Sequence, residues 1–475
     1  MKKKVIYAII LVLLLFGTAA FANQICKAKF TGDSTTIING FYEEEKNSID
    51  VIFIGSSNCF CTVNPLILYE KYGITAYDFA SSSQPMNISL LYLKEALKTQ
   101  NPKVVALEAN MLVGNGPENA TEAALRWGYT DIPFSIDKLR CIYQSTGKID
   151  GEYLSYVFPM LFYHNRWKEL TKSDYTYFAE DKWNPTKGYL MTDEVSESAI
   201  DFSDYELEGI ANLDEANLAC LDEMIALCRK QGVKLMLFKS PRQEWYSFHT
   251  KAVDELATER GIAYVDYNTL IDEIGLNGET DFRDAEHLNN AGAAKVTEHL
   301  GTYLVEQYGL EDRRSTGETV KSYEDALRYQ ERQYENTLPG IVDMTEYLET
   351  IGSMQDVTIV IAAEGKCGTP DEDAQQKLYA YHFQKANLKK GTQRVFHNGT
   401  SVFKAEGEEP YVSAVKCEDA EIVLVKQKGA TQLQIDGTDY HKVDNGINIV
   451  VYDHVTGQIA DAVGFDALNG YVAVR

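Results

Sequence analysis

The chain has 475 residues, of which 45% are hydrophobic and 24% charged, and its formal net charge is −25. That length exceeds one typical domain, so we expect two or three domains with ordinary globular cores. The acidic balance excludes nucleic acid as the main partner, because phosphate binding needs a basic face and no basic stretch of that kind is visible.

The N-terminus combines three lysines, Lys2 to Lys4, with an apolar stretch from Val5 to Ala22. Lysines in front of an apolar segment hold that end in the cytoplasm while the rest of the chain is exported. The sequence therefore predicts an extracytoplasmic protein. Residues 1–22 are either a cleaved signal peptide or an anchor that keeps the protein on the membrane through one helix, and residues 23–48 form a linker.

Residues 49–312 alternate short apolar strands with helices. Near-continuous apolar strands separated by helices predict an α/β domain, with a parallel sheet covered on both faces in three layers. The pattern breaks over about 115–205, which we interpret as an aromatic-rich, mostly helical insertion, either a satellite core or a wall for a sugar-type ligand. The expected strands are 51–54, 75–80, 103–108, 233–239 and 262–267, and the expected helices are 65–72, 85–99, 213–231, 249–260 and 290–305.

The last third of the chain has a different texture. Residues 313–340 are charged and helix-prone, and we expect them to form a helical linker. Short apolar runs after residue 341, with a hairpin around 453–457, predict a second domain that is mainly β and spans 341–475. The expected strands are 357–362, 411–415, 422–425, 447–452 and 471–474.

Eight cysteines are spread over the chain. No set of Cys and His residues has the spacing of a zinc site, so neither a metal site nor another cofactor is expected. Cys367 and Cys417 are the only cysteines in the last third, and export would favour their pairing. They are the best candidates for a disulfide.

A serine at the first expected strand and a late histidine carry the chemistry. Ser57 follows that strand, and ligands of parallel α/β sheets bind at the carboxyl ends of strands. It can supply both a nucleophile and a backbone N–H for an oxyanion, with Ser56 as the alternative. Asp284 can reach Nδ1 of His287 and leave Nε2 for the serine. The pattern predicts a catalytic set of Ser57, Asp284 and His287; the alternative is a helix-capping Asp beside a surface His.

At these motifs the chain resembles the SGNH/GDSL-type hydrolase superfamily. The family's G-D-S is Gly55-Ser56-Ser57 here, and its D-x-x-H matches Asp284 to His287 in full. The G-S-S variant is similar to extracytoplasmic branches linked to acyl groups on cell-surface polymers, such as the D-alanyl-teichoic-acid transfer protein and alginate O-acetylation proteins. The resemblance covers about residues 49–310 without the insertion, and it implies an SGNH-like (flavodoxin-like) domain.

The resemblance also implies oxyanion donors besides the N–H of Ser57. Ser83 stands where the family has a glycine, and its backbone N–H survives the exchange, although serine adopts a positive φ less readily. Asn110 is the candidate for the family's asparagine, with capping of a strand end as the alternative. Arg242 and Trp245 follow another expected strand at the same edge. They are candidate substrate-binding residues, unless they only shape a turn.

Residues 345–475 resemble the interleukin-like EMT-inducer (PANDER-like) domain. The segment 446–451, Gly-Ile-Asn-Ile-Val-Val, is similar to that domain's signature together with Thr456-Gly457 and Phe465-Asp466, and residues 357–362 with Gly365 fit an earlier strand. The resemblance implies a compact β-sandwich with small helices. It suggests carbohydrate recognition, and a stabilising or protein-binding role is the alternative.

Together these features predict an extracytoplasmic serine-dependent O-acyl esterase or acyltransferase that acts on a cell-surface polysaccharide or another acylated polymer. Water as the acyl acceptor would give an esterase, and a sugar hydroxyl would give a transferase. The sequence leaves both open, because the acyl-enzyme step is common to them. The alternative is a non-catalytic glycan- or protein-binding protein on a hydrolase scaffold whose oxyanion residues differ from those of the family.

Overall fold

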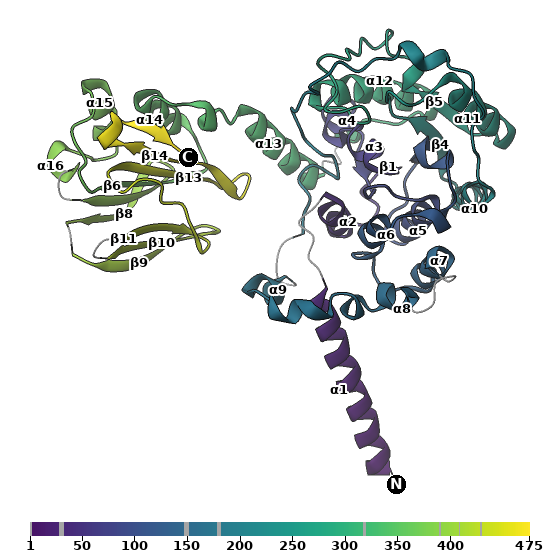
Figure 1. The fold of residues 1–475 in the computed structure, drawn as a ribbon, viewed down its shortest axis with the longest axis horizontal. Coiled ribbons are helices and arrows are strands. Elements are labelled where there is room, and N and C mark those ends of the chain that lie inside the picture. The colour runs from purple at the N-terminus through teal and green to yellow at the C-terminus, as the bar shows by residue number, and fades with distance from the viewer. Residues whose placement is uncertain are drawn as a thin grey trace. The chain divides into compact units, whose positions relative to one another are not determined.

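The chain forms two compact units, Met1–Leu327 and Arg328–Arg475 (Figure 1). The boundary falls inside helix α13 (Lys321–Glu335), so this helix contributes residues to both units. The computed structural model describes residues 2–27, 33–146, 152–177, 182–316, 320–388, 391–407, 409–427 and 430–475.

The first unit is built on a five-stranded sheet of order β2-β1-β3-β4-β5, in which every neighbouring pair is parallel. All residues of β1, β2 and β3 are buried, as expected for a parallel sheet covered on both faces. The predicted α/β class and parallel sheet are therefore confirmed. The strands are β1 (Val51–Ile54), β2 (Ala76–Asp78), β3 (Val104–Glu108), β4 (Lys234–Lys239) and β5 (Ala263–Asp266).

Helices cover the two faces of this sheet. Helices α4 and α12 pack against each other on one side, and α5 and α10 pack against each other on the other (Figure 1). The polar signals in the sequence set the helix ends: the Asn289 side chain accepts hydrogen bonds from the first N–H groups of α12, and Gly232 ends α10 with a φ of +75°. The helices are α4 (Pro65–Tyr72), α5 (Met86–Ala96), α10 (Glu215–Gln231), α11 (Ser247–Arg260) and α12 (Asn290–Tyr308).

The expected insertion lies between β3 and α10 and is helical over much of residues 122–176. Tyr129 and Tyr156 belong to the core of the first unit, whereas Phe134, Tyr143 and Trp167 are exposed. Part of the aromatic set is therefore packed into the core of the first unit, and part of it is exposed. The helices are α6 (Glu122–Tyr129), α7 (Ile136–Thr146), α8 (Glu152–Val157) and α9 (Lys172–Thr176).

The N-terminal segment forms helix α1 (Lys2–Cys26), whose end is held by the insertion. The backbone N–H of Met160 donates to Asn23 Oδ1 at 2.9 Å, and Arg166 donates to the carbonyl of Lys27 at 2.5 Å. Within the described parts of the chain, no helix has both the length and the apolar character needed to cross a membrane. The exposed apolar side chains of α1 include Ile6, Leu11, Leu14 and Phe21.

Two stretches expected to be linkers contribute to the first core. Helix α2 (Asp33–Glu43) buries Phe41, whose ring stacks on Phe79 at a centroid distance of 4.0 Å. In α13, the fully buried Tyr323 donates its hydroxyl to the carbonyl of Ala76 at 2.6 Å. Helix α2 and the first part of α13 are therefore packed parts of the first unit.

The second unit contains two antiparallel sheets. The six-stranded sheet has the order β15-β14-β13-β6-β7-β8, and the four-stranded sheet has the order β12-β11-β10-β9. The predicted hairpin around residues 453–457 joins β13 to β14. The strands are β6 (Val357–Glu364), β7 (Thr392–His397), β8 (Thr400–Glu406), β9 (Tyr411–Cys417), β10 (Ala420–Gln427), β11 (Ala430–Ile435), β12 (Thr438–Asp439), β13 (Gly446–Asp453), β14 (Gln458–Asp466) and β15 (Val472–Val474).

Alternating residues of β6 serve two cores. Val360 packs with Ile422 of the four-stranded sheet, so the two sheets share one core. Its neighbour Ile359 packs on the opposite face with Leu378. This period of two is what a strand between two apolar layers requires. Helices α14 (Met344–Ser353) and α15 (Glu372–Ala380) cover the second face, and the expected mainly β unit with small helices is present.

The candidate disulfide between Cys367 and Cys417 is not formed. All eight cysteines are free in the structure. Cys367 belongs to the core under the helices, and Cys417 belongs to the core between the sheets. The two thiols therefore lie on opposite faces of the six-stranded sheet, which a disulfide cannot bridge.

Candidate functional site

Ser57 begins the single helical turn α3 (Ser57–Phe60) immediately after β1. The turn needs a glycine in front of it, because a Cβ on Gly55 would lie 2.7 Å from the Cβ of Glu108. Ser56 is buried, with 2% exposure, whereas Ser57 is partly exposed. Of the two adjacent serines, Ser57 is therefore the one accessible to a ligand.

The three predicted catalytic residues come together. Nε2 of His287 lies 2.8 Å from Oγ of Ser57, and Nδ1 lies 2.9 and 3.0 Å from the two carboxylate oxygens of Asp284. A carboxylate at Nδ1 fixes the tautomer that carries its proton there. The Nε2 lone pair then faces the serine hydroxyl, which is the orientation that a general base needs.

The surroundings of Asp284 keep its carboxyl group ionised. Partial burial acts to raise the pKa of Asp284, but hydrogen bonds from the Glu286 N–H and His287, together with the charges of His287 and Arg283, hold this pKa below its ordinary value. The N–H groups of Glu286 and His287 donate to Oδ1 at 2.8 and 3.0 Å. The carboxylate is therefore available to stabilise a protonated imidazole.

Two loops flank Ser57, because β1 lies between β2 and β3 in the sheet. Ser83, in the loop after β2, is exposed and has a φ of +51°. The serine thus adopts the left-handed conformation that a glycine would take most easily. Asn110 lies in a 3-10 turn (Ala109–Leu112) after β3. Both candidate oxyanion residues are therefore carried by loops at the edge of the sheet where Ser57 lies.

The Asn110 side chain has a fixed orientation. Its Oδ1 accepts a hydrogen bond from Arg242 Nη1 at 3.3 Å, and its backbone N–H donates to Glu108 at 3.0 Å. The amide nitrogen has only a weak contact of 3.9 Å with the sulfur of Met111. The NH₂ group thus remains a potential donor.

Arg242 connects Asn110 to the turn that contains Asp284 and His287. Its Nη2 donates to Glu286 at 2.5 Å, and its backbone N–H donates to Asn268 at 2.9 Å. The side chain is 12% exposed, and its Nε is buried with no hydrogen-bond partner among the described atoms. This placement fits a residue that holds the site together better than a free arm in a substrate groove.

Trp245, the other candidate substrate-binding residue, lies in the core. It is 3% exposed, and its indole N–H donates to Asp266 at 2.9 Å and to Thr250 at 3.1 Å. A buried ring whose only polar group is already bonded cannot line an open groove. The structure therefore favours the alternative, in which Trp245 shapes the turn after β4.

An ion pair that the sequence did not reveal contacts the residue that follows Ser57. Lys239 and Glu108 are fully buried at the ends of β4 and β3, with Nζ 2.8 Å from Oε1. Burial lowers the pKa of Lys239, and the charge of Glu108 opposes this shift. Lys239 also donates to Asn58 at 3.4 Å, next to Ser57, and so joins the ends of β3 and β4 to α3. The signal in the sequence was a charged residue at the end of each of two apolar strands, Lys239 in β4 and Glu108 in β3.

The comparisons with known proteins give no family assignment. No family model matches the chain, and no curated protein matches it. One solved structure, described as a gut microbial diltiazem-metabolizing enzyme, aligns with 56% of this chain and 48% of its own, at 14% identity and a TM-score of 0.21. The chain thus spans about half the length of that enzyme, and a likeness this weak carries no argument about fold or activity.

Proposed function

We propose that the first unit is a serine-dependent O-acyl esterase or acyltransferase of the SGNH type. The observation that carries this proposal is the 2.8 Å contact between Ser57 Oγ and His287 Nε2, with Asp284 at the opposite nitrogen. A hydroxyl becomes an effective nucleophile when a neighbouring base accepts its proton. This order of serine, imidazole and carboxylate is typical of acyl transfer.

In the proposed reaction, Oγ of Ser57 attacks the acyl carbonyl while Nε2 of His287 takes the hydroxyl proton. Asp284 stabilises the imidazolium, and the N–H groups of Ser57 and Ser83, with the Asn110 amide, hold the oxyanion. The ester C–O bond then breaks, and His287 returns the proton to the leaving alcohol. In the second half, His287 takes a proton from water or a sugar hydroxyl, whose oxygen attacks the acyl carbonyl. The bond from that carbonyl to Oγ of Ser57 then breaks, and His287 returns the proton to Oγ.

The substrate class and location belong to the same proposal. The lysines and apolar residues of segment 2–22 support export, by cleavage or by an N-terminal anchor. The resemblance of Gly55-Ser56-Ser57 to extracytoplasmic enzymes supports an acylated cell-surface polysaccharide or polymer as substrate. The second unit would then contribute recognition of a glycan or of a protein.

A fluorophosphonate probe tests the proposal, because it labels an activated serine without knowledge of the substrate. We expect the folded full-length chain to be labelled, Ser57→Ala to lose labelling, and Ser56→Ala, the matched control one residue away, to keep it. Circular dichroism checks the fold of each variant. Absence of labelling on the folded wild-type chain, or equal labelling of Ser57→Ala, overturns the proposal and leaves the non-catalytic binding protein.

A further inference from the structure

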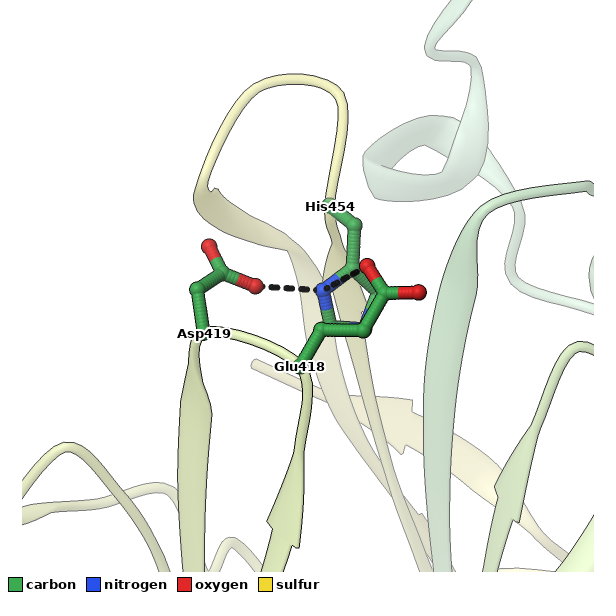
Figure 2. A group of neighbouring side chains, drawn as sticks. All are labelled: Glu418, Asp419 and His454. Carbon is green, nitrogen blue, oxygen red and sulfur yellow. Dashed lines mark hydrogen bonds and ion pairs between the residues drawn. The ribbon is translucent and has the colours of Figure 1, made fainter.

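A second group of titratable side chains lies in the second unit, away from the proposed acyl-transfer residues in sequence. Glu418 and Asp419 form the turn between β9 and β10, and His454 begins the turn after β13. Figure 2 shows both carboxylates directed at the imidazole. One ligand atom from each of the three residues lies within 4.8 Å of the other two.

Neighbouring side chains fix these groups. Nδ1 of His454 is 2.6 Å from Asp419 Oδ1 and 3.7 Å from Glu418 Oε2. The second oxygen of Asp419 accepts a hydrogen bond from the Tyr452 hydroxyl at 2.9 Å, and the second oxygen of Glu418 is 3.3 Å from Nε2 of His397. Each carboxylate therefore directs one oxygen at His454, and its other oxygen contacts a residue outside this group of three, Tyr452 or His397.

The imidazole of this group is buried, and its two carboxylates are exposed. The His454 side chain is 4% exposed, whereas Asp419 and Glu418 are 56% and 60% exposed. A buried ring below two exposed carboxylates leaves a path by which an ion can enter from solvent.

Thr358 holds the rings of His454 and His397, each at the ring nitrogen opposite the one that faces a carboxylate. Its hydroxyl, fully buried on β6, lies 2.8 Å from Nε2 of His454 and 3.0 Å from Nδ1 of His397. A hydroxyl has one proton, so at least one of the two rings must donate its own N–H to Thr358. The other nitrogen of each ring faces a carboxylate: Nδ1 of His454 faces Asp419, and Nε2 of His397 faces Glu418. The contact with Thr358 thus leaves Nδ1 of His454 as the ring nitrogen available to a ligand beside Asp419.

The geometry points to a divalent transition-metal cation, with Zn²⁺ as the best fit, held by His454, Glu418 and Asp419. Imidazole and carboxylate together suit this class of ion. Two donors at about 2.1 Å from a tetrahedral Zn²⁺ lie about 3.4 Å apart, close to the 3.7 Å between His454 and Glu418. The exposed Asp419 needs only a small shift. Three protein ligands leave one position for water or another ligand.

Thr358 has the place of an outer-shell residue in this site. Ligand histidines in metal sites usually give their second ring nitrogen to a hydrogen-bond partner, which fixes the tautomer and the ring orientation. Here one buried hydroxyl does this for His454 and, at the same time, for His397. Thr358 also lies between the two strands concerned: in the six-stranded sheet it pairs with His397 of β7 and with Tyr452 of β13.

Calorimetric titration of the metal-free full-length chain with Zn²⁺ alone tests the site. We expect one equivalent to bind, with at least about 10-fold weaker affinity in Asp419→Asn, which keeps the shape of the exposed side chain, and in His454→Ala. His441→Gln is the matched control: His441 lies 3.6 Å from Glu364 in the same unit but outside the site, and its loss should change nothing. Thr358→Val should weaken binding about 10- to 100-fold, and Thr358→Ser should restore it.

Titration with Co²⁺ separates this site from the eight free cysteines. Thiolate ligands give an intense sulfur-to-metal charge-transfer band, whereas a site of nitrogen and oxygen ligands gives only weak d–d bands. We expect the d–d bands alone for the first equivalent, and their loss in Asp419→Asn. No saturable binding by the folded chain, equal affinity in His454→Ala and wild type, or a thiolate band for the first equivalent each overturn the proposal.

Discussion

Asn110 is the proposed oxyanion residue whose side chain the structure holds in a fixed orientation. Arg242 holds its amide oxygen, so its NH₂ group is left to donate. We therefore expect Asn110→Ala to lower the rate of fluorophosphonate labelling by about 10²-fold, the usual effect of removing one oxyanion donor. Asn119→Ala, at an exposed position in the following turn, is the control and should react like the wild type.

The role of Arg242 follows from the same measurement. If Arg242 acts by orienting Asn110, Arg242→Met should slow labelling on its own but add little to Asn110→Ala, because the two effects are not additive for residues that act as a unit. Full labelling of Asn110→Ala would show instead that this residue only caps the end of β3.

Whether a site residue could be predicted from the sequence depends on how far along the chain its contacting partner lies. Asp284 and His287 lie three residues apart, so one turn suffices to join them, and Ser57 is placed by the strand before it. The contact of Arg242 with Asn110 joins residues 132 positions apart. The ligands of the proposed cation site are likewise scattered, since Asp419 and His454 are 35 positions apart. No local spacing can reveal such pairs.

At the scale of the elements, the ion pair of Lys239 and Glu108 joins the ends of β4 and β3. Lys239→Met leaves a buried carboxylate without its partner, which should lower the free energy of unfolding of the first unit by about 3–5 kcal/mol. The double variant Lys239→Met/Glu108→Leu removes both charges and should recover most of this loss. Urea denaturation followed by tryptophan fluorescence measures it.

Lys234→Met is the matched control for this pair, because Lys234 is exposed at the opposite end of β4. It should change the free energy of unfolding by less than about 0.5 kcal/mol. A Lys239→Met variant as stable as this control would mean that Glu108 finds another partner or takes up a proton when Lys239 is absent.

Strands and helices could be predicted from the sequence where their apolar residues form a clear pattern. All five parallel strands lie within the predicted ranges, because strands buried on both faces read as continuous apolar runs. Helix α13 was expected to be a linker because its exposed positions are strongly charged. Its buried face is small: Tyr323 and Ala326 lie three residues apart. They pack against Leu66 and Tyr69. Only the structure shows that this small face is covered.

At the scale of the whole molecule, the two units have separate hydrophobic cores, so they could unfold together or independently. Leu237 belongs to the core of the first unit, and Ile449 to a core of the second. Helix α13 crosses the boundary between the units: Tyr323 is buried in the first, and Arg332 forms an ion pair of 3.0 Å with Asp453 in the second. A continuous helix can transmit unfolding, whereas separate cores favour independent transitions.

We expect the separate cores to prevail, so that scanning calorimetry of the full-length chain shows two transitions. Replacing a buried Leu or Ile by Ala costs about 2–5 kcal/mol, so Leu237→Ala should lower only the first unit's transition and Ile449→Ala only the second's. All four tryptophans precede residue 328, so fluorescence identifies the first unit's transition. A single transition that both variants shift equally would show instead that α13 couples the two units into one cooperative molecule.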